Sequence, residues 1–518
     1  MELYDILVVG GGVNGTAVAR HAAGDGLKVL LCERDDLAEH TSSSSTKLIH
    51  GGLRYLEHYD FKLVREALIE REVLLRSAPH IIWPLRFVLP YDRSLRPAWL
   101  LRTGLFIYDH LGGRKMLPGT ERVELDEPPH AGLLKSEFEF GFEYSDCWVE
   151  DSRLVVLACV DARERGAAIR VRTSVTSVEP DGNAFRADLS DGTAVRARAV
   201  VNAAGPWVEE VLSRTGIPRR DTSELRLVKG SHIVTEKLFE GDHCYIFQNG
   251  DGRIIFAIPY ERHYTLIGTT DQPYSPEQGP PEISEEETDY LCSAASEYFA
   301  KPVTRDLIRH TYSGVRPLYD DRASDAASVT RDYVLDMAET GAGPVLSVYG
   351  GKITTSRHLA LDAMKQLSGH IPGYKATNWT RDAHLPGGDV ALSEAALSEA
   401  SSGGQTRGGV GIAGTLERLA EHHPDLHPEL ALRLARAYGS RVHAVLQSGA
   451  GEPLTPRLPA SLLAPEVDHL VAHEWAREPD DVLWRRSKMG LHMTDGERAT
   501  FADWFAERYR ADAQYAAQ

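Results

Sequence analysis

Residues 5–33, DILVVGGGVNGTAVARHAAGDGLKVLLCE, decide the fold of this chain. A short apolar run ends at three glycines, a helix-like segment follows, and a second apolar run ends in Glu33. This order of strand, glycine turn, helix, strand and acid is typical of a dinucleotide-binding unit. Gly10, Gly12 and Gly15 permit a tight turn, close approach of a diphosphate, and close packing of helix on strand. The helix N-terminus then faces the diphosphate, and the Glu33 carboxylate can bond a ribose hydroxyl.

Three later segments carry the same kind of signal. Residues 41–56 read TSSSSTKLIHGGLRYL, a hydroxyl-rich run that can follow an extended cofactor with its hydroxyl and backbone N–H groups. Residues 195–207 (VRARAVVNAAGPW) and 344–358 (PVLSVYGGKITTSRH) are strands that run into small residues, where backbone can approach a ligand. The helix expected after Gly350 and Gly351 has a positive N-terminus. Together these segments favour a nucleotide site, although the first glycine turn by itself does not separate FAD from NAD.

The remaining motifs make the assignment specific. Several segments resemble, in the same order, the FAD-dependent (respiratory) glycerol-3-phosphate dehydrogenase family, within the D-amino-acid-oxidase-like flavoproteins. They are SSSSTKLIHGGLRYLEHYDF, GFEYSDCWVEDSRL, KGSHIV, IGTTD, TYSGVRPL, TRDY, YGGKITTSRHLA and, near the C-terminus, DDVLWRRSKMGL. The resemblance runs from residue 4 to about residue 388 and covers most of the chain. It implies oxidation of sn-glycerol 3-phosphate to dihydroxyacetone phosphate by hydride transfer to FAD, with a membrane quinone as electron acceptor.

The resemblance also implies an α/β fold with a discontinuous Rossmann-type FAD-binding domain and an antiparallel-sheet substrate domain. We expect the FAD-binding domain at residues 1–80, 147–225 and 330–385, and the substrate domain at 81–146 and 226–329. The Ser/Gly-rich stretch 386–414 is typical of a linker, and the helical periodicity beyond it predicts a C-terminal helical domain at 415–518.

The expected site residues follow from these motifs. For the cofactor we expect Gly10, Gly12, Gly15, Glu33, Ser42, Ser43, Ser45, Lys47, Leu48, His50, Ala203, Gly205, Gly351, Lys352, Ile353 and Thr354. For the substrate we expect Arg54, Tyr55, Thr269, Arg316 and Arg331. Arginines suit a phosphate dianion because the guanidinium fork donates two hydrogen bonds at once.

Oxidation of an alcohol needs a base for the hydroxyl proton and cations for the developing alkoxide. His50 and His232 are the candidates for the base, since histidine titrates near neutral pH. The sequence does not choose between them. Arg316 and Lys352 are the catalytic cations, and Lys352 could stabilise either the alkoxide or the reduced flavin.

Length, net charge and cysteine content limit the classes of protein to which this chain can belong. A length of 518 residues predicts two or three domains, and a net charge of −18 argues against a general nucleic-acid binder. The five cysteines are scattered, so we expect neither a disulfide framework nor a metal site. No secretory signal and no membrane-spanning run stands in the sequence, so a cytoplasmic location is expected. We also expect a homodimer.

One stretch departs from the acidic trend. Residues 83–115 carry six Lys/Arg against two Asp, with Trp83, Trp99 and Phe106 interleaved. This composition is typical of a surface that lies on an anionic bilayer, on the cytoplasmic face of the inner membrane. The alternative is a helix packed on the substrate domain.

Two further functions share the fold. An oxidase of glycerol 3-phosphate would pass electrons to oxygen, and an amine or amino-acid oxidase would hold a carboxylate instead of a phosphate. A third alternative, from another class, is a flavin-binding protein without turnover.

Overall fold

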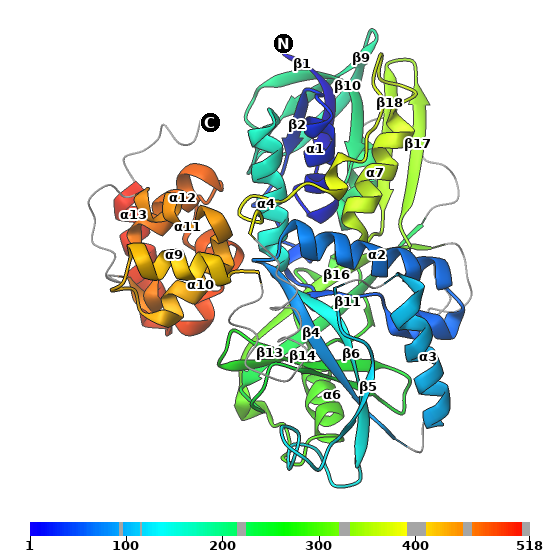
Figure 1. Ribbon diagram of the computed structural model, residues 1–518. Helices are drawn as coiled ribbons and strands as arrows, with labels where there is room; N and C mark the ends of the chain where they lie inside the picture. The colour runs from blue at the N-terminus through cyan, green and yellow to red at the C-terminus, as the bar shows by residue number, and fades with distance from the viewer. Residues whose placement is uncertain are drawn as a thin grey trace.

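The computed structural model describes residues 1–92, 97–113, 116–214, 224–320, 332–390, 411–448 and 458–509. These residues form two mixed α/β layers that share a long middle helix, and a separate cluster of helices beside them (Figure 1).

Within the described residues, eight strands form the first sheet, in the order β17-β18-β10-β1-β2-β7, with β9 paired to β10 and β8 to β9. The strands are β1 (Leu3–Val9), β2 (Val29–Cys32), β7 (Ala168–Arg170), β8 (Val175–Asp181), β9 (Ala184–Leu189), β10 (Ala194–Asn202), β17 (Val334–Thr340) and β18 (Gly343–Tyr349). The chain leaves β1 for β2 on one side, whereas β10 lies parallel to β1 on the other. The carboxyl ends of parallel strands beside such a reversal are where doubly wound sheets bind nucleotides.

Apolar residues alternate along the strands, so side chains are buried on both faces of this sheet. Ile6 and Val8 of β1 pack under the helices α1 (Val13–Gly24), α4 (Asp151–Glu164) and α7 (Ser356–Leu367). Leu7 and Val9 point the other way, toward the cluster built with β8 and β9. α5 (Val208–Arg214) packs against Tyr349 of β18.

Ten described strands form the second sheet, in the order β15-β11-β14-β13-β12-β4-β6-β3, with β16 paired to β11 and β5 to β6. The strands are β3 (Leu48–Ile49), β4 (Ile82–Pro90), β5 (Glu121–Glu124), β6 (Phe140–Val149), β11 (Glu224–Glu236), β12 (Cys244–Gln248), β13 (Ile254–Tyr260), β14 (Tyr264–Gly268), β15 (Gln272–Pro273) and β16 (Ile308–Asp320). The sheet is antiparallel except where β4 runs parallel to β12. α6 (Glu285–Ser296) covers one face. α2 (Phe61–Ser77) and α3 (Ala98–Leu111) lie on the other side.

The boundary between the sheets differs from the expected one at residue 80. β3 pairs with β6, and α2 packs on the second sheet, so residues 48–80 already belong partly to that layer. Short 3-10 turns lie where the two layers meet: η1 (Thr41–Ser43) and η3 (Gly205–Trp207) contact β16, η6 (Ile353–Thr355) contacts α2 and β3, and η2 (Leu53–His58) contacts α2 and α3. These turns, and not the sheets, therefore carry much of the expected site.

The C-terminal helices have a core of their own. They are α9 (Ala413–His422), α10 (Pro428–Tyr438), α11 (Val442–Gln447), α12 (Ala464–His473), a π-helical turn at Asp481–Arg486, the 3-10 turn Met489–His492, and α13 (Asp495–Tyr509). Leu419, Leu434, Leu470 and Phe501 are among its fully buried residues. In Figure 1 this domain lies beside α4. Most of the expected linker, residues 391–410, lies outside the described residues.

Residues 83–90 do not form the surface face that was expected of them. They lie in β4, where Arg86 pairs with Glu121 and Glu143 and Trp83 packs against Trp148. Partner acids neutralise the Arg86 charge, so this part of the prediction is wrong. Arg93, Arg96, Arg114 and Lys115 lie outside the described residues. Among the described residues, we find no helix with the length and apolar composition needed to cross a membrane.

Candidate functional site

The glycine turn between β1 and α1 leaves no room for side chains. A Cβ at Gly10 would lie 2.6 Å from the Ala203 carbonyl oxygen, and a Cβ at Gly15 would lie 1.9 Å from the Gly10 carbonyl oxygen. Gly10 also has a φ of +112°, which L side chains avoid. Gly12 stands at the N-cap of α1 and has no side chain to cap it. The N-terminus of α1 is therefore open to an anion.

The Glu33 carboxylate is fixed beside this turn. Its two oxygens accept the backbone N–H groups of Gly11 at 2.6 Å and Asp35 at 2.9 Å. Burial raises the pKa of Glu33, and these two hydrogen bonds act against that rise. Each carboxylate oxygen has a second lone pair, so Glu33 can also accept a ribose hydroxyl.

Three turns of the first sheet meet at the start of α1. Gly10 touches Ala203 after β10, and Asn14 Nδ2 donates to the Gly350 carbonyl oxygen after β18 at 3.0 Å. Gly350 and Gly351 have φ values of +72° and +97°. Asn14 was not among the residues predicted from the sequence, although it lies inside the glycine run itself. Its buried Oδ1 has no hydrogen-bond partner within the described part of the chain, so it is available to a ligand.

The first half of the hydroxyl-rich segment lies beside the N-terminus of α1. Ser42 Oγ accepts the N–H of Val13 at 3.0 Å and lies where a Cβ at Gly12 would almost touch it. Ser43 Oγ remains in its own turn and donates to the His40 carbonyl oxygen at 3.2 Å. Of these two expected cofactor residues, Ser42 thus reaches the helix terminus through its side chain.

The second half of the segment is tied to α4. Ser45 Oγ donates to Asp151 Oδ2 at 2.7 Å, and Lys47 Nζ lies 2.8 Å from the same oxygen. Lys47 is 1% exposed, and Leu48 is buried in the core of the second sheet. The side chains of Lys47 and Leu48 are therefore not available to a cofactor.

A first cluster of expected residues surrounds His50. Its N–H donates to Thr354 Oγ1 at 3.3 Å, and Lys352 Nζ lies 4.0 Å from the centre of the Tyr55 ring. Burial lowers the pKa of His50, and the positive charge of Lys352 lowers it further. The imidazole is therefore neutral at pH 7. Arg54 lies next to Tyr55 and forms no ion pair or hydrogen bond with any described residue, so its guanidinium is available to an anion.

A second cluster surrounds His232, which is 1% exposed. Its Nε2 lies 3.0 Å from Thr46 Oγ1, its ring stacks on Tyr312 at 4.7 Å, and its Nδ1 has no partner among the described residues. Burial, and then the charge of Arg316, holds the pKa of His232 well below its usual value. His232 is thus a neutral imidazole with one unused nitrogen.

Arg316 lies on the neighbouring strand, on the same side as His232. Its Nη2 donates to Thr269 Oγ1 at 3.1 Å, and its Nη1 pairs with Asp271. The side chain is 34% exposed, so it can also meet a ligand. Gly230 makes room for it, because a Cβ there would lie 2.5 Å from Arg316 Nη2.

The two clusters meet across the three adjacent strands β13, β14 and β11. The Phe256 ring lies 6.4 Å from the His50 ring, and the sheet register places Phe256 opposite Gly268. Gly268 also lies opposite His232, and a Cβ on it would stand 2.1 Å from the His232 ring. His50 and His232 therefore border a common region, formed where the first sheet's turns face the second sheet.

The other expected residues are placed as follows. Thr354 is buried, and Ile353 packs with the core between α2 and α4. Gly205, with φ of +57°, begins the turn after β10. Arg331 lies outside the described residues.

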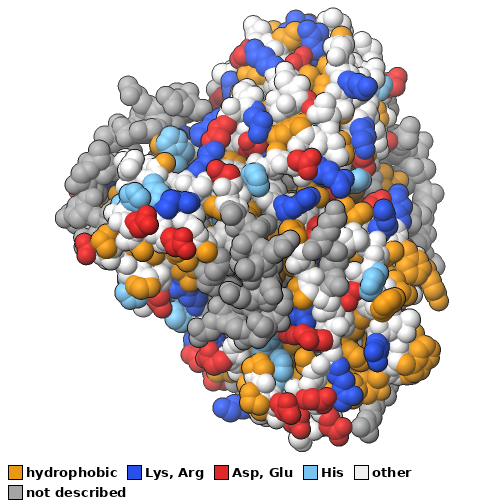
Figure 2. Space-filling model, in the orientation of Figure 1, with side chains coloured by type: hydrophobic (Ala, Val, Ile, Leu, Met, Phe, Trp, Pro, Cys, Tyr) orange, Lys and Arg blue, Asp and Glu red, His pale blue; other side chains and the backbone are white. Residues whose placement is uncertain are grey.

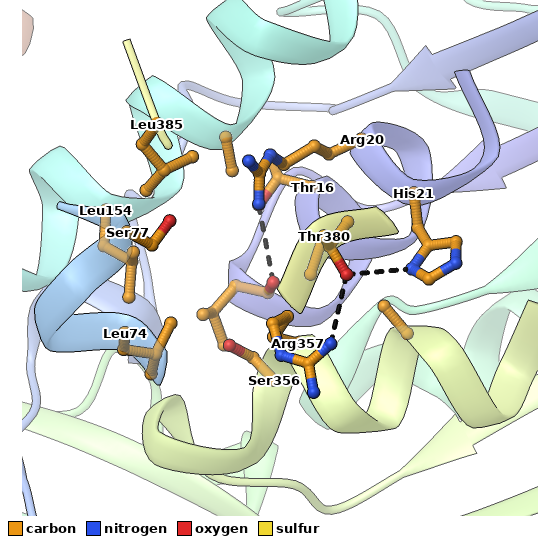
Figure 3. Close-up of a pocket in the computed structure, with 14 residues that line it drawn as sticks. Thr16, Arg20, His21, Leu74, Ser77, Leu154, Ser356, Arg357, Thr380 and Leu385 are labelled. Carbon is orange, nitrogen blue, oxygen red and sulfur yellow. Dashed lines mark hydrogen bonds between the residues drawn. The ribbon is translucent and has the colours of Figure 1, made fainter. Parts of the chain in front are cut away.

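Two cavities among the described residues lie away from this region. Figure 3 shows one of about 30 Å³ between α1, α2, α4 and α7. Arg20 and Arg357 border it and pair with Asp161 and Glu70, so it belongs to the packing of the helices. A larger hollow of about 690 Å³, lined by Lys229 and Glu287, lies on the α6 side of the second sheet. His232 faces the opposite side, because successive strand residues alternate.

Comparison with known proteins identifies the class. The family model described as "FAD dependent oxidoreductase" matches residues 5–357, and the model of the "C-terminal domain of alpha-glycerophosphate oxidase" matches residues 379–512. A D-erythritol 1-phosphate dehydrogenase of Brucella abortus is 47% identical over 97% of this chain and 98% of its own length. A glycerol-3-phosphate dehydrogenase of Pseudomonas aeruginosa is also 47% identical, over 98% and 96%. The structure of the Bacillus halodurans glycerol-3-phosphate dehydrogenase with FAD has a TM-score of 0.73 at 26% identity, covering 99% of this chain and 92% of that one.

The fold and the converging glycine turns therefore define an FAD-dependent oxidoreductase. Within that class, the chain belongs to the FAD-dependent glycerol-3-phosphate dehydrogenase family. The predicted family, fold class and cofactor are confirmed.

The residues present fit FAD. The start of α1, where Gly12 brings no side chain, suits the diphosphate, and Glu33 suits the ribose. The unpartnered Asn14 Oδ1 is an acceptor for a cofactor donor group, and the absent side chains at Gly10 and Gly351 leave the backbone open to close approach.

Proposed function

We propose that this chain oxidises sn-glycerol 3-phosphate to dihydroxyacetone phosphate. One observation carries the proposal: the charges of Lys352 and Arg316 act on two imidazoles that are held neutral, and Arg54 precedes Tyr55, whose ring Lys352 faces. A phosphate dianion needs the cations, and a secondary hydroxyl needs a neutral base. The glycerol-3-phosphate dehydrogenases among the relatives support this substrate.

The arginines would anchor the phosphate. Arg54 has no competing partner in the described chain, and Arg316 offers the part of its fork that Asp271 and Thr269 do not use. Each charge-assisted hydrogen bond contributes roughly 1.5–3 kcal/mol. Two such anchors would largely offset the desolvation of the dianion.

The proton of the hydroxyl at carbon 2 would pass to an imidazole. His232 Nδ1 has no partner and His50 is neutral, so each can accept it. Lys352, whose charge acts on His50, would stabilise the alkoxide as it forms. Bound FAD supplies the two-electron acceptor for the hydrogen that leaves carbon 2. Replacing His50 or His232 by Asn separately distinguishes the two bases, since the true base controls kcat at saturating substrate.

A longer polyol phosphate is a second candidate substrate. The D-erythritol 1-phosphate dehydrogenase is as similar to this chain as the Pseudomonas enzyme, at 47% identity each. Both substrates combine a phosphate with secondary hydroxyl groups, so the same cations would serve either one. Direct comparison of kcat/KM for the two compounds decides between them.

The electron acceptor would be a membrane quinone, reached by peripheral attachment. Five of the exposed large apolar side chains gather at one corner, where α3 meets the start of α2. They are Tyr59, Phe61, Trp99, Leu100 and Phe106. Figure 2 shows hydrophobic side chains at the edge of the molecule where Figure 1 places α3. We call these five residues the apolar corner.

Basic side chains border the apolar corner. Lys62, Arg65 and Arg102 are exposed beside it, which favours an anionic lipid surface. Acidic residues, Glu57 and Asp60, are exposed there as well. Apolar burial is therefore the larger contribution and charge the smaller. The expected homodimer stays a prediction that a sedimentation measurement can test.

An anaerobic titration tests the proposed function. Glycerol 3-phosphate should bleach the visible flavin band of the purified protein, and D-erythritol 1-phosphate should be titrated in parallel. Reduced protein should then be reoxidised by a soluble quinone faster than by oxygen. Failure of both phosphates to bleach the flavin would refute the proposal, whereas rapid formation of peroxide in air would favour the oxidase.

A further inference from the structure

One charged segment of the C-terminal domain, residues 481–488 (DVLWRRSK), contacts the flavin-binding layer. It consists of the π-helical turn Asp481–Arg486 and the two residues that follow. Its side chains reach two places in the first layer, and each place adjoins a segment expected to hold the cofactor.

The first contact is a buried ion pair. Arg486, which is 1% exposed, donates from Nη2 to Asp36 Oδ1 at 2.8 Å, and Arg485 Nε lies 2.5 Å from Asp36 Oδ2. Asp36 is itself 1% exposed, and within the described chain its cationic partners are these two arginines. A buried carboxylate requires such partners, because an isolated charge is costly in a protein interior. The C-terminal domain therefore fixes Asp36.

Asp36 belongs to the loop that holds the ribose acid. It follows Glu33 by three residues, and the next residues close the loop onto the glycine turn. The N–H of Ala38 donates to the Gly11 carbonyl oxygen at 3.2 Å, while the N–H of Gly11 donates to Glu33 Oε2 at 2.6 Å. A displacement of Asp36 would thus move both walls of the expected ribose site.

The second contact lies at the start of α4. The buried Lys488 donates from Nζ to Ser152 Oγ at 3.3 Å and to the Trp484 carbonyl oxygen at 2.6 Å. Ser152 follows Asp151, the carboxylate that holds Ser45 and Lys47. Among the described residues, Lys488 has no carboxylate within ion-pair distance, so its charge is not explained by a structural salt bridge.

Trp484 extends the second contact to the base cluster. Its ring stacks on His310 at 4.7 Å with an interplanar angle of 13°. His310 lies on β16, two residues before Tyr312, whose ring stacks on His232. The Tyr312 hydroxyl also donates to the Ser45 carbonyl oxygen at 2.8 Å. Two ring stacks, on positions 310 and 312 of the same strand, therefore link Trp484 to His232 through β16.

We propose that residues 481–488 are a positioning element of the flavin site. Arg486 holds the loop that carries Glu33, and Lys488 with Trp484 holds the segments that carry Ser45, Lys47 and His232. None of these three side chains is a catalytic residue; each acts through a neighbour. The effect on turnover rests on the proposed function, whereas the effect on FAD binding does not.

The test uses the full-length holoenzyme with four variants. Arg486→Lys keeps the charge but loses the fork that bridges Asp36 and the Glu474 carbonyl oxygen. Lys488→Met keeps the volume and loses the donor. Arg441→Ala removes an exposed ion pair to Glu164 across the same domain contact, away from the cofactor segments. Arg433→Gln breaks a pair with Glu466 inside the C-terminal domain and controls for its stability.

Three readouts separate positioning from docking. Arg486→Lys should raise the FAD dissociation constant by about tenfold or more. Lys488→Met should retain FAD, change the visible circular dichroism of the flavin, and lower kcat more than it changes KM. Arg441→Ala and Arg433→Gln should leave FAD affinity and the flavin spectrum unchanged.

Equal losses of FAD in Arg441→Ala and Arg486→Lys would overturn the proposal, since domain docking alone would explain them. So would wild-type FAD affinity and flavin spectra in both Arg486→Lys and Lys488→Met. If the wild type itself is not reduced by either phosphate, the proposed function fails, but FAD affinity and the flavin spectrum still decide the positioning role.

Discussion

The guanidinium of Arg316 contacts other side chains of the protein, yet the side chain also stays partly exposed to a ligand. Its Nη1 pairs with Asp271, its Nη2 bonds Thr269 Oγ1, and about a third of the side chain remains exposed. Arg309, on the same strand, pairs with Glu236 at the surface. The two arginines have the same chemistry and similar exposure, but only Arg316 borders the region of the two imidazoles. Position in the sheet therefore gives Arg316 its proposed role.

We predict that Arg316→Ala lowers kcat/KM for glycerol 3-phosphate by roughly 10- to 150-fold, the equivalent of one charge-assisted hydrogen bond to phosphate. FAD content should not change, because Arg316 lies outside the glycine turns. Arg309→Ala is the matched control and should behave as the wild type. Steady-state kinetics with a soluble dye provide the measurement.

Glycerol, which lacks the phosphate, provides a second control for this residue. The rate ratio between wild type and Arg316→Ala should fall close to one with glycerol. If the variant loses the same factor with both alcohols, or loses its flavin, then Arg316 supports the structure and does not bind phosphate.

Single residues differ in how far the sequence predicts them. The first glycine turn was predictable because Gly10, Gly12 and Gly15 lie within one short run of sequence, although the atom that a Cβ at Gly10 would meet belongs to the distant Ala203. Asn14 was missed, since its partner Gly350 stands 336 positions away in the chain. The same reason applies to the pair of Lys47 with Asp151, which stands 104 positions away in the chain.

At the scale of elements, residues 83–115 show that composition does not by itself predict which element a stretch of sequence forms. The basic, aromatic stretch 83–115 has one composition, yet it contains a strand of the second sheet and an exposed helix. Composition does not distinguish the two, whereas the pairing of β4 with β6 and β12 does. Tyr59 and Phe61 also could not be predicted as part of the apolar corner, since the contact between α3 and the start of α2 is tertiary.

We predict that replacing Trp99, Leu100 and Phe106 together by Ser abolishes binding to lipid vesicles. These side chains are 68%, 45% and 63% exposed, so their removal leaves the core intact. Dye-linked turnover and FAD content should persist. Co-sedimentation with vesicles of anionic and of zwitterionic lipid provides the measurement, and equal sedimentation of variant and wild type would contradict the prediction.

The salt dependence of vesicle binding separates the electrostatic contribution from the apolar one. The Debye length falls from about 10 Å at 0.1 M salt to about 3 Å at 1 M, so the part due to Lys62, Arg65 and Arg102 should disappear. The part due to the apolar corner should remain. Arg102→Glu should weaken binding at low salt, whereas Arg186→Glu, on β9 at the far end of the first layer, should not.

At the scale of the whole molecule, the sequence predicted three parts and their chemistry but not how they join. The discontinuous flavin layer follows from three glycine turns in one chain. The joining surfaces depend on buried ion pairs between distant segments, such as Arg153 with Glu474 and Arg486 with Asp36. No local pattern marks these pairs. The division of residues 48–80 between two layers was missed for the same reason.

Burial of neutral histidines gives the whole molecule a pH-dependent stability. Burial lowers the pKa of His80 to about 3 and the pKa values of His310 and His469 to about 4, from 6.5. Below pH 6.5 the unfolded chain gains protons that the folded chain does not, so folding stability falls as the pH decreases toward 4. Glu150 opposes this trend, because burial raises its pKa to about 7 and the folded state then holds the proton between pH 7 and 4.5.

We predict a net loss of stability between pH 7.5 and pH 5.5, with each of the three histidines contributing about 1 kcal/mol and Glu150 offsetting part of the sum. Urea unfolding at saturating FAD, followed at both pH values, provides the measurement. His310→Gln and His469→Gln should each flatten the dependence, since glutamine does not titrate, whereas the exposed His422→Gln should leave it unchanged. Stability that is equal or greater at pH 5.5, or variants with the same slope as the wild type, would show that these histidines acquire protons in the folded state.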